Sequence, residues 1–163
     1  AVHDACVLGG RHFVVHGGLK PEGYRDNDTF VLDLHARPLR WLEVSPGGVH
    51  SPRRPTARFH HTFTPLLDRE RVVIFGGHDR RIAPITGVAV LRLPPSPLGE
   101  AADPAWDLVP TQHDARLAGP GPRARHSAAP LGRSGLAVFG GSGPGLQNIL
   151  NDLWAFDAVE ACW

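Results

Sequence analysis

The 163-residue sequence contains no methionine, two cysteines, one tyrosine and a single lysine, Lys20. Because an initiating methionine is missing, we expect the sequence to be a portion of a longer polypeptide. Cys6 and Cys162 are too few for a disulfide framework or a thiolate zinc site. We expect both to be ordinary half-buried thiols, and a reducing compartment, the cytoplasm, is the predicted location.

Long hydrophobic runs and a charge imbalance are also missing. The apolar runs fall short of the roughly 18 residues that span a membrane, and the first residues resemble neither a signal nor a transit peptide. With 17 basic and 16 acidic residues the formal net charge is only +1, so no global field attracts nucleic acid or an anionic membrane. We expect one soluble domain that binds neither, because the 42% hydrophobic content suffices for a core.

A repeated phrase is what the sequence does contain. Three apolar runs, FVVHGG, VVIFGG and LAVFGG, end in paired glycines, which are Gly17 and Gly18, Gly76 and Gly77, and Gly140 and Gly141. Successive pairs are 59 and 64 residues apart (17 to 76 and 76 to 140). A histidine precedes each pair by 14 or 15 residues, namely His3, His61 and His126. A fixed phrase at such a period indicates a repeat architecture.

Each repeat unit contains signals for four short strands. Turn-like segments at 8–11, 67–70 and 131–134 separate two apolar runs between the histidine and the glycines. Alternating apolar and polar residues predict a third strand at 27–33, 86–92 and 151–157. A tryptophan then opens a fourth run at Trp41, Trp106 or Trp163. Four antiparallel strands per unit, without helical periodicity, are typical of a propeller blade.

The order of these elements, from histidine through Gly-Gly and Asn-Asp-x-Trp/Phe-x-Phe/Leu-Asp to tryptophan, resembles the kelch repeat over almost the whole chain. The resemblance implies an all-β, kelch-type β-propeller fragment of three four-stranded antiparallel blades, with the last blade incomplete. The predicted blades cover about 1–46, 57–111 and 123–163. The residues expected to form the structural repeat signature are His3, Gly17, Gly18, Asp33, Trp41, His61, Gly76, Gly77, Trp106, His126, Gly140, Gly141, Asn151, Asp152, Trp154, Asp157 and Trp163.

The paired glycines have a predicted role where blades meet. Glycine tolerates positive φ and close backbone approach, so we expect each pair to turn its strand beside the Trp and Phe side chains packed between blades. The repeated histidines are expected to hydrogen-bond within or between blades. Propellers close with 4 to 8 blades, so a three-bladed stack exposes apolar faces that must be covered. The same polypeptide, a second copy giving six blades, or a different partner could supply the missing blades.

Function in such a fold is expected on the loops. Loops after the second and fourth strands share one face of the disc, and the candidate partner-binding residues there are Lys20, Arg25, Arg53, Arg54, Arg80, Arg81 and Arg116. Arginine binds carboxylates and phosphates bidentately, so the predicted partner is a protein with an acidic surface. The alternative is that GC-rich coding scattered arginines over solvated loops. The Pro- and Ala-rich insertion 94–105 on the opposite face is expected to be a solvated loop.

No motif for catalysis, a cofactor or a metal is complete. Kelch-like propellers that resemble galactose oxidase hold copper with tyrosines and histidines, but Tyr24 is the only tyrosine here. The Glu-x-x-x-Asp-x-x-x-His iron motif of kelch-type specifier proteins has Phe30 in place of its histidine. His12 and His16, on a strand, lie roughly 13 Å apart, too far for one metal ion. We therefore expect no catalytic residue, no cofactor and no bound metal.

The sequence thus predicts a non-catalytic protein-protein interaction module that presents propeller loops to a protein partner. One alternative is a structural subunit built permanently into a large assembly of cytoskeletal or ciliary type, which would place the protein there. Another is a part of an enzyme that carries a kelch domain. Whether the protein purifies free or only within an assembly discriminates the first two.

Overall fold

The computed structural model describes residues 2–21, 23, 25–44, 54–94, 104–109, 119–145 and 148–163, with Arg25 described by its backbone alone. These residues form β1 (Asp4–Leu8), β2 (His12–Leu19), β3 (Arg25–Asp33), β4 (Trp41–Glu43), β5 (Thr62–Pro65), β6 (Arg71–Phe75), β7 (Val88–Arg92), β8 (Ala105–Val109), β9 (Ser127–Leu131), β10 (Gly135–Ser142) and β11 (Ile149–Asp157). Within the described ranges there is no helix that could cross a membrane.

The strands pair into three antiparallel sheets. Blade 1 has the order β1-β2-β3-β4, blade 2 the order β5-β6-β7-β8, and blade 3 the order β9-β10-β11. The short turns expected between the first two strands of each unit close the hairpins β1-β2, β5-β6 and β9-β10. The predicted fold class, an all-β stack of three antiparallel blades with an incomplete last blade, is confirmed.

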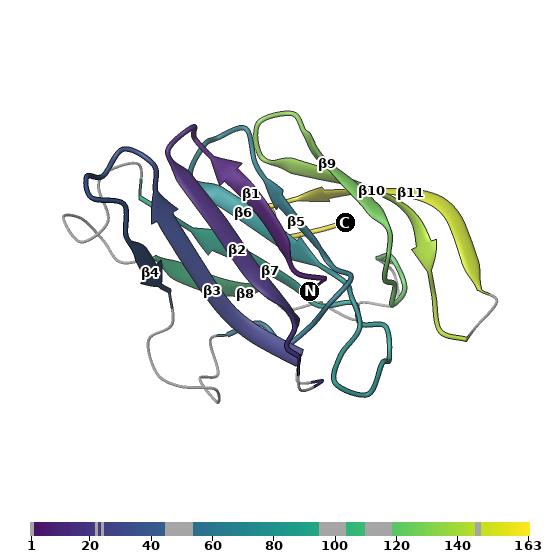
Figure 1. Cartoon of the computed structure of the whole chain (residues 1–163). Coiled ribbons are helices and arrows are strands. Elements are labelled where there is room, and N and C mark those ends of the chain that lie inside the picture. The colour runs from purple at the N-terminus through teal and green to yellow at the C-terminus, as the bar shows by residue number, and fades with distance from the viewer. Residues whose placement is uncertain are drawn as a thin grey trace.

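The three blades stand side by side in chain order, as the colours from purple to yellow show in Figure 1. The first strand of each blade neighbours the first strand of the next, because β1 contacts β5 and β5 contacts β9. This arrangement, with the first strands at the inner edge and the later strands fanning outward, is that of a propeller sector.

Two hydrophobic cores fill the two contacts between neighbouring blades, which we call joint 1/2 and joint 2/3. The buried core of joint 1/2 contains Leu8, Val14, Val31 and Val44 of blade 1 with Phe63, Val72, Ile74, Ala89, Leu91 and Leu93 of blade 2. The buried core of joint 2/3 contains Leu66, Val73, Phe75, Val88 and Val90 of blade 2 with Leu136, Val138 and Phe156 of blade 3. The stack is therefore held together mainly through its joints.

Blade 2 is covered on both faces, and its sequence reflects this. The strand β6 carries the unbroken apolar run 72–75, and all four of these side chains are fully buried. In β11, by contrast, exposed and partly buried positions alternate along most of the strand. A strand buried on both faces needs apolar residues at every position, whereas a strand covered on one face needs them only at alternate positions.

The paired glycines lie at the joints, but their neighbours differ from the prediction. Gly76 has a φ of +61°, and a Cβ built on it would lie 2.5 Å from the Arg123 carbonyl oxygen and 2.7 Å from His126 Cε1. Gly17 meets the corresponding groups of blade 2 in the same way. The expected turn is present, since the paired glycines have positive φ, but the groups nearest to Gly17 and Gly76 are not Trp or Phe side chains. The backbone and histidine of the next blade fill the space, so a side chain would collide with a main chain that cannot swing aside.

Candidate protein-interaction surface

A buried arginine fixes the start of blade 2 and of blade 3. Arg58 is 3% exposed and Arg123 is 1% exposed. Each Nη1 donates to the first glycine of its own blade's pair, at 3.0 Å to Gly76 O and 3.1 Å to Gly140 O. Each arginine carbonyl accepts a hydrogen bond from the second glycine of the preceding blade, in the pairs Gly18 N to Arg58 O at 3.0 Å and Gly77 N to Arg123 O at 2.9 Å.

Among the described residues only one of these two arginines has a carboxylate partner. Arg123 donates from Nη1 and Nη2 to Asp152 at 2.7 and 2.9 Å, and these hydrogen bonds hold the pKa of Asp152 well below its usual value. Asp152 follows Arg123 by 29 residues. The residue that follows Arg58 by 29 in blade 2 is Gly87, and its carbonyl oxygen accepts a hydrogen bond from Arg58 Nη1 at 3.0 Å. Burial lowers the pKa of Arg58 to about 10, so the guanidinium stays charged at neutral pH.

Replacing Gly87 with aspartate should stabilise the protein. A Cβ on Gly87 would lie 3.3 Å from Arg58 Nη2, and φ there is outside the left-handed region, so Gly87→Asp can reproduce the Arg123–Asp152 pair. Charge-assisted hydrogen bonds to a buried guanidinium stabilise by about 1.5–3 kcal/mol, from which desolvation of the new carboxylate subtracts. We expect a net gain of about 1–2 kcal/mol in the free energy of unfolding, measured by urea denaturation at neutral pH.

Gly87→Ala and Gly87→Asn are the matched controls for that measurement. Both remove the conformational freedom of glycine from the unfolded chain, which by itself gives about 0.4–1 kcal/mol. Neither supplies a negative charge to Arg58. An aspartate variant no more stable than the alanine variant would show that the carbonyl oxygens already satisfy the guanidinium.

Two of the three repeated histidines, His61 and His126, are buried in the joints, and their hydrogen bonding differs. His126 Nε2 lies 2.9 Å from Thr62 Oγ1 across joint 2/3, as the sequence predicts. His61 packs edge-on against His16, with ring centroids 5.5 Å apart, but neither of its ring nitrogens has a hydrogen-bond partner among the described residues. Burial lowers the pKa of His126 to about 4 and of His16 to about 3, so both are neutral at physiological pH.

The signature aspartates at the end of the third strands cap the turns that follow. Asp33 Oδ1 accepts from His35 N at 2.9 Å, and its other oxygen pairs with Arg11 at 2.7 Å. Asp157 Oδ1 accepts from Val159 N at 2.7 Å in the same position of blade 3. These side chains therefore shape the loops and do not reach out to a ligand.

The seven basic residues predicted to bind a partner have different outcomes. Arg53 and Arg116 lie outside the described residues, and of Arg25 only the backbone is described. Lys20 is exposed, yet its Nζ lies 2.8 Å from Asp26 Oδ2 and 3.4 Å from Asp28 Oδ2. Hydrogen bonds and charge from Asp26 raise the pKa of Lys20. The lysine charge is thus already matched within blade 1.

Arg54 does not belong to an exposed cluster, which corrects the prediction for this residue. Its side chain is 6% exposed, and its guanidinium lies 3.7 Å from both Asp28 Oδ1 and Glu43 Oε1. Asp28 belongs to β3 and Glu43 to β4, so Arg54 ties the start of the segment entering blade 2 to the outer strands of blade 1. A side chain so engaged cannot reach a partner protein.

Arg80 and Arg81 are exposed, and they stand on a tightly organised loop at 79–83 between β6 and β7. Asp79 Oδ1 accepts from Arg81 N at 2.8 Å and from Ala83 N at 2.9 Å. Asp79 N in turn donates to Ala83 O at 2.9 Å. We call 79–83 the Asp79 loop. Its backbone is held in one shape before any partner arrives, which lowers the entropic cost of binding.

Ile82 gives the Asp79 loop an apolar tip. Its side chain is 60% exposed, and its φ of +62° lies in the left-handed region. A β-branched residue with positive φ is a genuine outlier, and such strain persists where the surrounding hydrogen bonds enforce it, often at binding sites. The loop therefore presents an isoleucine directly beside two arginines.

A histidine pair and a third arginine lie at the base of the Asp79 loop. His60 Nδ1 and His78 Nδ1 are 3.4 Å apart, and Arg125 N donates to His60 O at 3.0 Å. Burial first, and then the charge of Arg125, lowers the pKa of both histidines. They are uncharged at neutral pH, while exposed Arg125 carries a positive charge close to both.

The cationic surface thus consists of Arg80, Arg81 and Arg125, with Ile82 at its tip. None of the three arginines forms an ion pair with another described residue. Sequence reasoning missed Ile82, because nothing local marks a positive φ at an isoleucine. Asp79 was the one available signal for an organised loop, because an aspartate side chain often accepts a hydrogen bond from the backbone N–H two residues further on, in an Asx turn.

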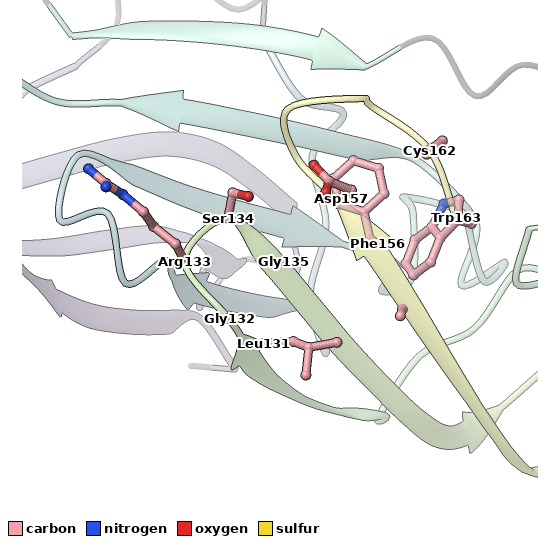
Figure 2. A pocket seen from close by; sticks show the side chains of 10 residues that line it. Leu131, Gly132, Arg133, Ser134, Gly135, Phe156, Asp157, Cys162 and Trp163 are labelled. Carbon is pink, nitrogen blue, oxygen red and sulfur yellow. The ribbon is translucent and has the colours of Figure 1, made fainter.

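The described residues line one hollow whose side chains bear on the question of catalysis. They contain no group of three or more His, Cys, Asp or Glu side chains placed to hold a metal ion. An open hollow of about 380 Å³ lies on blade 3, between the β9-β10 turn and residues 162–163, and Figure 2 shows the side chains that line it. Arg133 extends away from Asp157 there (Figure 2), and Asp157 already accepts backbone hydrogen bonds. Arg133 and Asp157, which both line this hollow, are therefore not paired with each other.

The chain belongs to the kelch-repeat family, because residues 2–163 match the family described as the KLHDC2/KLHL20/DRC7 Kelch-repeats domain. It is similar to a putative adagio-like protein 2 of Oryza sativa subsp. japonica, with 36% identity over 85% of this chain and 19% of that protein. It is also similar to the F-box/kelch-repeat protein At1g51550 of Arabidopsis thaliana, with 24% identity over 96% of this chain and 30% of that protein. The chain therefore spans less than a third of either relative.

Among solved structures, the fold resembles that of YjhT. The TM-score is 0.65, and the match covers 94% of this chain and 41% of that chain. With 15% sequence identity, this similarity concerns the fold alone.

Proposed function

We propose that the chain is a non-catalytic protein-interaction module whose Asp79 loop and Arg125 bind a partner carrying clustered carboxylates. The observation that carries the proposal is the loop itself, in which Asp79 fixes the backbone and Ile82 is held exposed at positive φ. Membership in the kelch-repeat family supports an interaction role. A cytoplasmic location is part of the proposal and rests on the two free cysteines, Cys6 and Cys162.

The chemistry of the surface selects carboxylates on a protein partner. The guanidinium group of arginine can form two parallel hydrogen bonds with a planar carboxylate. The neighbouring Ile82 adds an apolar contact, which a purely ionic surface lacks. Arginine is one of the residue types enriched at interaction hot spots. The earlier alternative, arginines scattered by codon bias, does not require an organised loop beneath them.

Reversing the loop charges should abolish binding while the fold stays intact. We expect Arg80→Glu with Arg81→Glu to weaken binding of a glutamate-rich, leucine-containing peptide at least tenfold, a loss of about 1.4 kcal/mol or more. The measurement is fluorescence anisotropy with labelled peptide at low and high salt, because contacts between exposed charges weaken with ionic strength. Circular dichroism confirms that each variant is folded.

The matched control reverses two exposed arginines on the opposite edge, Arg69 on the β5-β6 turn and Arg133 on the β9-β10 turn. Arg69→Glu with Arg133→Glu changes the net charge by the same amount but leaves the Asp79 loop untouched. An equal loss in both double variants would mean that the peptide responds to net charge alone, and an unchanged affinity in the loop variant would refute the proposed surface.

A further inference from the structure

The histidine pair at the base of the Asp79 loop has the spacing of two metal ligands. His60 precedes β5 and His78 follows β6, so residues 18 apart in the sequence meet, and their Nδ1 atoms are 3.4 Å apart. An ordinary N–H···O hydrogen bond is shorter, about 2.7–3.2 Å. Two nitrogens bound to one tetrahedral zinc ion at about 2.0–2.1 Å are themselves about 3.3–3.4 Å apart. The observed separation therefore suits a shared metal ion.

The repeat does not require a histidine at either of these positions. His60 directly precedes the signature histidine of blade 2, and His78 directly follows its Gly-Gly. The same two positions hold Val2 and Leu19 in blade 1, and Arg125 and Ser142 in blade 3. The backbone bridge beside these positions is the same in blades 2 and 3. A structural role shared by all blades therefore does not explain why blade 2 has two histidines here.

The two imidazole rings are held in place by their surroundings. The buried ring of Phe59 packs against both, with ring centroids 4.7 Å from His60 and 5.2 Å from His78. His78 N donates to Phe59 O at 2.8 Å, and Phe59 N donates to His78 O at 3.2 Å. His60 is partly exposed, so an ion can reach the pair from solvent. Ligands that are already oriented lose little conformational freedom on binding.

The charges around the pair leave room for a cation. Imidazole must be neutral to bind a metal ion, and burial, followed by the charge of Arg125, lowers the pKa of both histidines. Arg125 also repels a cation. The carboxylate of Asp79 acts on the pKa of His78 in the opposite direction, so it partly offsets that repulsion. We therefore expect the pair to bind a metal ion with moderate affinity.

We propose that His60 and His78 bind one divalent transition-metal ion, such as Zn²⁺, through their Nδ1 atoms. Imidazole nitrogen suits zinc, copper and nickel, whereas Mg²⁺ and Ca²⁺ select oxygen ligands. The described part of the chain places no group of three His, Cys, Asp or Glu side chains around a metal ion, so water fills the other positions and the ion exchanges with solvent. The site goes beyond the proposed binding of carboxylates and does not depend on it.

Isothermal titration calorimetry of the 163-residue chain with Zn²⁺, and without any peptide, tests the site. We expect one zinc ion per chain with a micromolar Kd at neutral pH, and no binding of Mg²⁺. His60→Val with His78→Leu copies the residues of blade 1 at these positions, so it should keep the β-sheet circular dichroism and weaken zinc binding at least tenfold. His35→Gln, at an exposed histidine in blade 1, is the control and should bind zinc like the wild type.

Nitrogen NMR of the imidazole rings gives an independent readout. Zinc should shift the Nδ1 resonances of His60 and His78. Arg125→Gln removes the opposing charge, so we expect this variant to bind zinc more tightly than the wild type. The absence of saturable zinc binding, binding that persists in the double variant, or shifts confined to other histidines would overturn the proposal. Such a result would leave the binding of carboxylates untouched, because no peptide takes part in these measurements.

Discussion

Gly76→Ala should cost about 4 kcal/mol of unfolding free energy, a large share of the total of about 5–15 kcal/mol. An alanine Cβ would lie 2.5 Å from the Arg123 carbonyl oxygen, at a φ of +61°. Left-handed backbone costs a non-glycine residue about 1–2 kcal/mol, and overpacking against a fixed main chain adds about 1–3 kcal/mol. The shift needed to relieve the clash also stretches the Gly77 N to Arg123 O hydrogen bond of 2.9 Å. Urea denaturation and soluble yield measure the effect.

Gly10→Ala separates backbone strain from collision. Gly10 has a φ of +73°, and a Cβ there would meet nothing within 4 Å, so the control carries the conformational cost alone. We expect it to lose about 1–2 kcal/mol. If Gly76→Ala lost no more than Gly10→Ala, the joints would be able to yield, and the picture of a main chain pressed rigidly against the glycine would be wrong.

The fold was predictable because three repeat units carry the same structural residues in the same order. Paired glycines, hairpin turns and tryptophans recur in register, and each copy supports the assignment of the others. The joint chemistry was less accessible. Arg58 and Arg123 recur three residues before the histidines, but their hydrogen bonds go to carbonyl groups of Gly76 and Gly140. Hydrogen bonds to backbone carbonyl oxygens cannot be predicted from the pattern of side chains in a sequence.

The candidate surface could be predicted only in part, for reasons visible in individual residues. Arg80 and Arg81 were recognisable as a loop pair, whereas Arg54 looked equally free. Its two acidic neighbours come from β3 and β4, and only the folded chain brings them to it. Arg125 directly precedes the signature residue His126, and only the folded chain brings it close to His60 and His78.

Lowering the pH from about 7 to about 5 should strongly destabilise the protein through its joint histidines. Burial, followed by nearby arginine charge, lowers the pKa of His16 to about 3 and of His126 to about 4. Burial and then His16 place the pKa of His61 well below its usual value. The unfolded chain takes up these protons near pH 6.5 and the folded chain does not. Stability is therefore full above pH 6.5 and falls progressively below it.

We expect the free energy of unfolding to depend steeply on pH. Each histidine that binds a proton only when unfolded removes up to about 1.4 kcal/mol per pH unit, so three remove about 4 kcal/mol per unit. Native domains have about 5–15 kcal/mol in total, and the carboxylates of Asp33 and Asp152 have lowered pKa values, so they titrate only at lower pH. Urea denaturation at about pH 7.5, 6.5 and 5.5 measures the slope directly.

The chain supplies its own matched variant for this prediction. His16 pairs across the sheet with Thr29, and at the same place blade 2 has Phe75 paired with Val88. The double change His16→Phe with Thr29→Val therefore copies a joint that already exists, and it also avoids leaving buried Thr29 without the Nδ1 contact of 2.8 Å. We expect the pH slope to fall by about a third, or 1.4 kcal/mol per unit. An unchanged slope in this variant, or a stability independent of pH above 5, would assign acid unfolding to other groups.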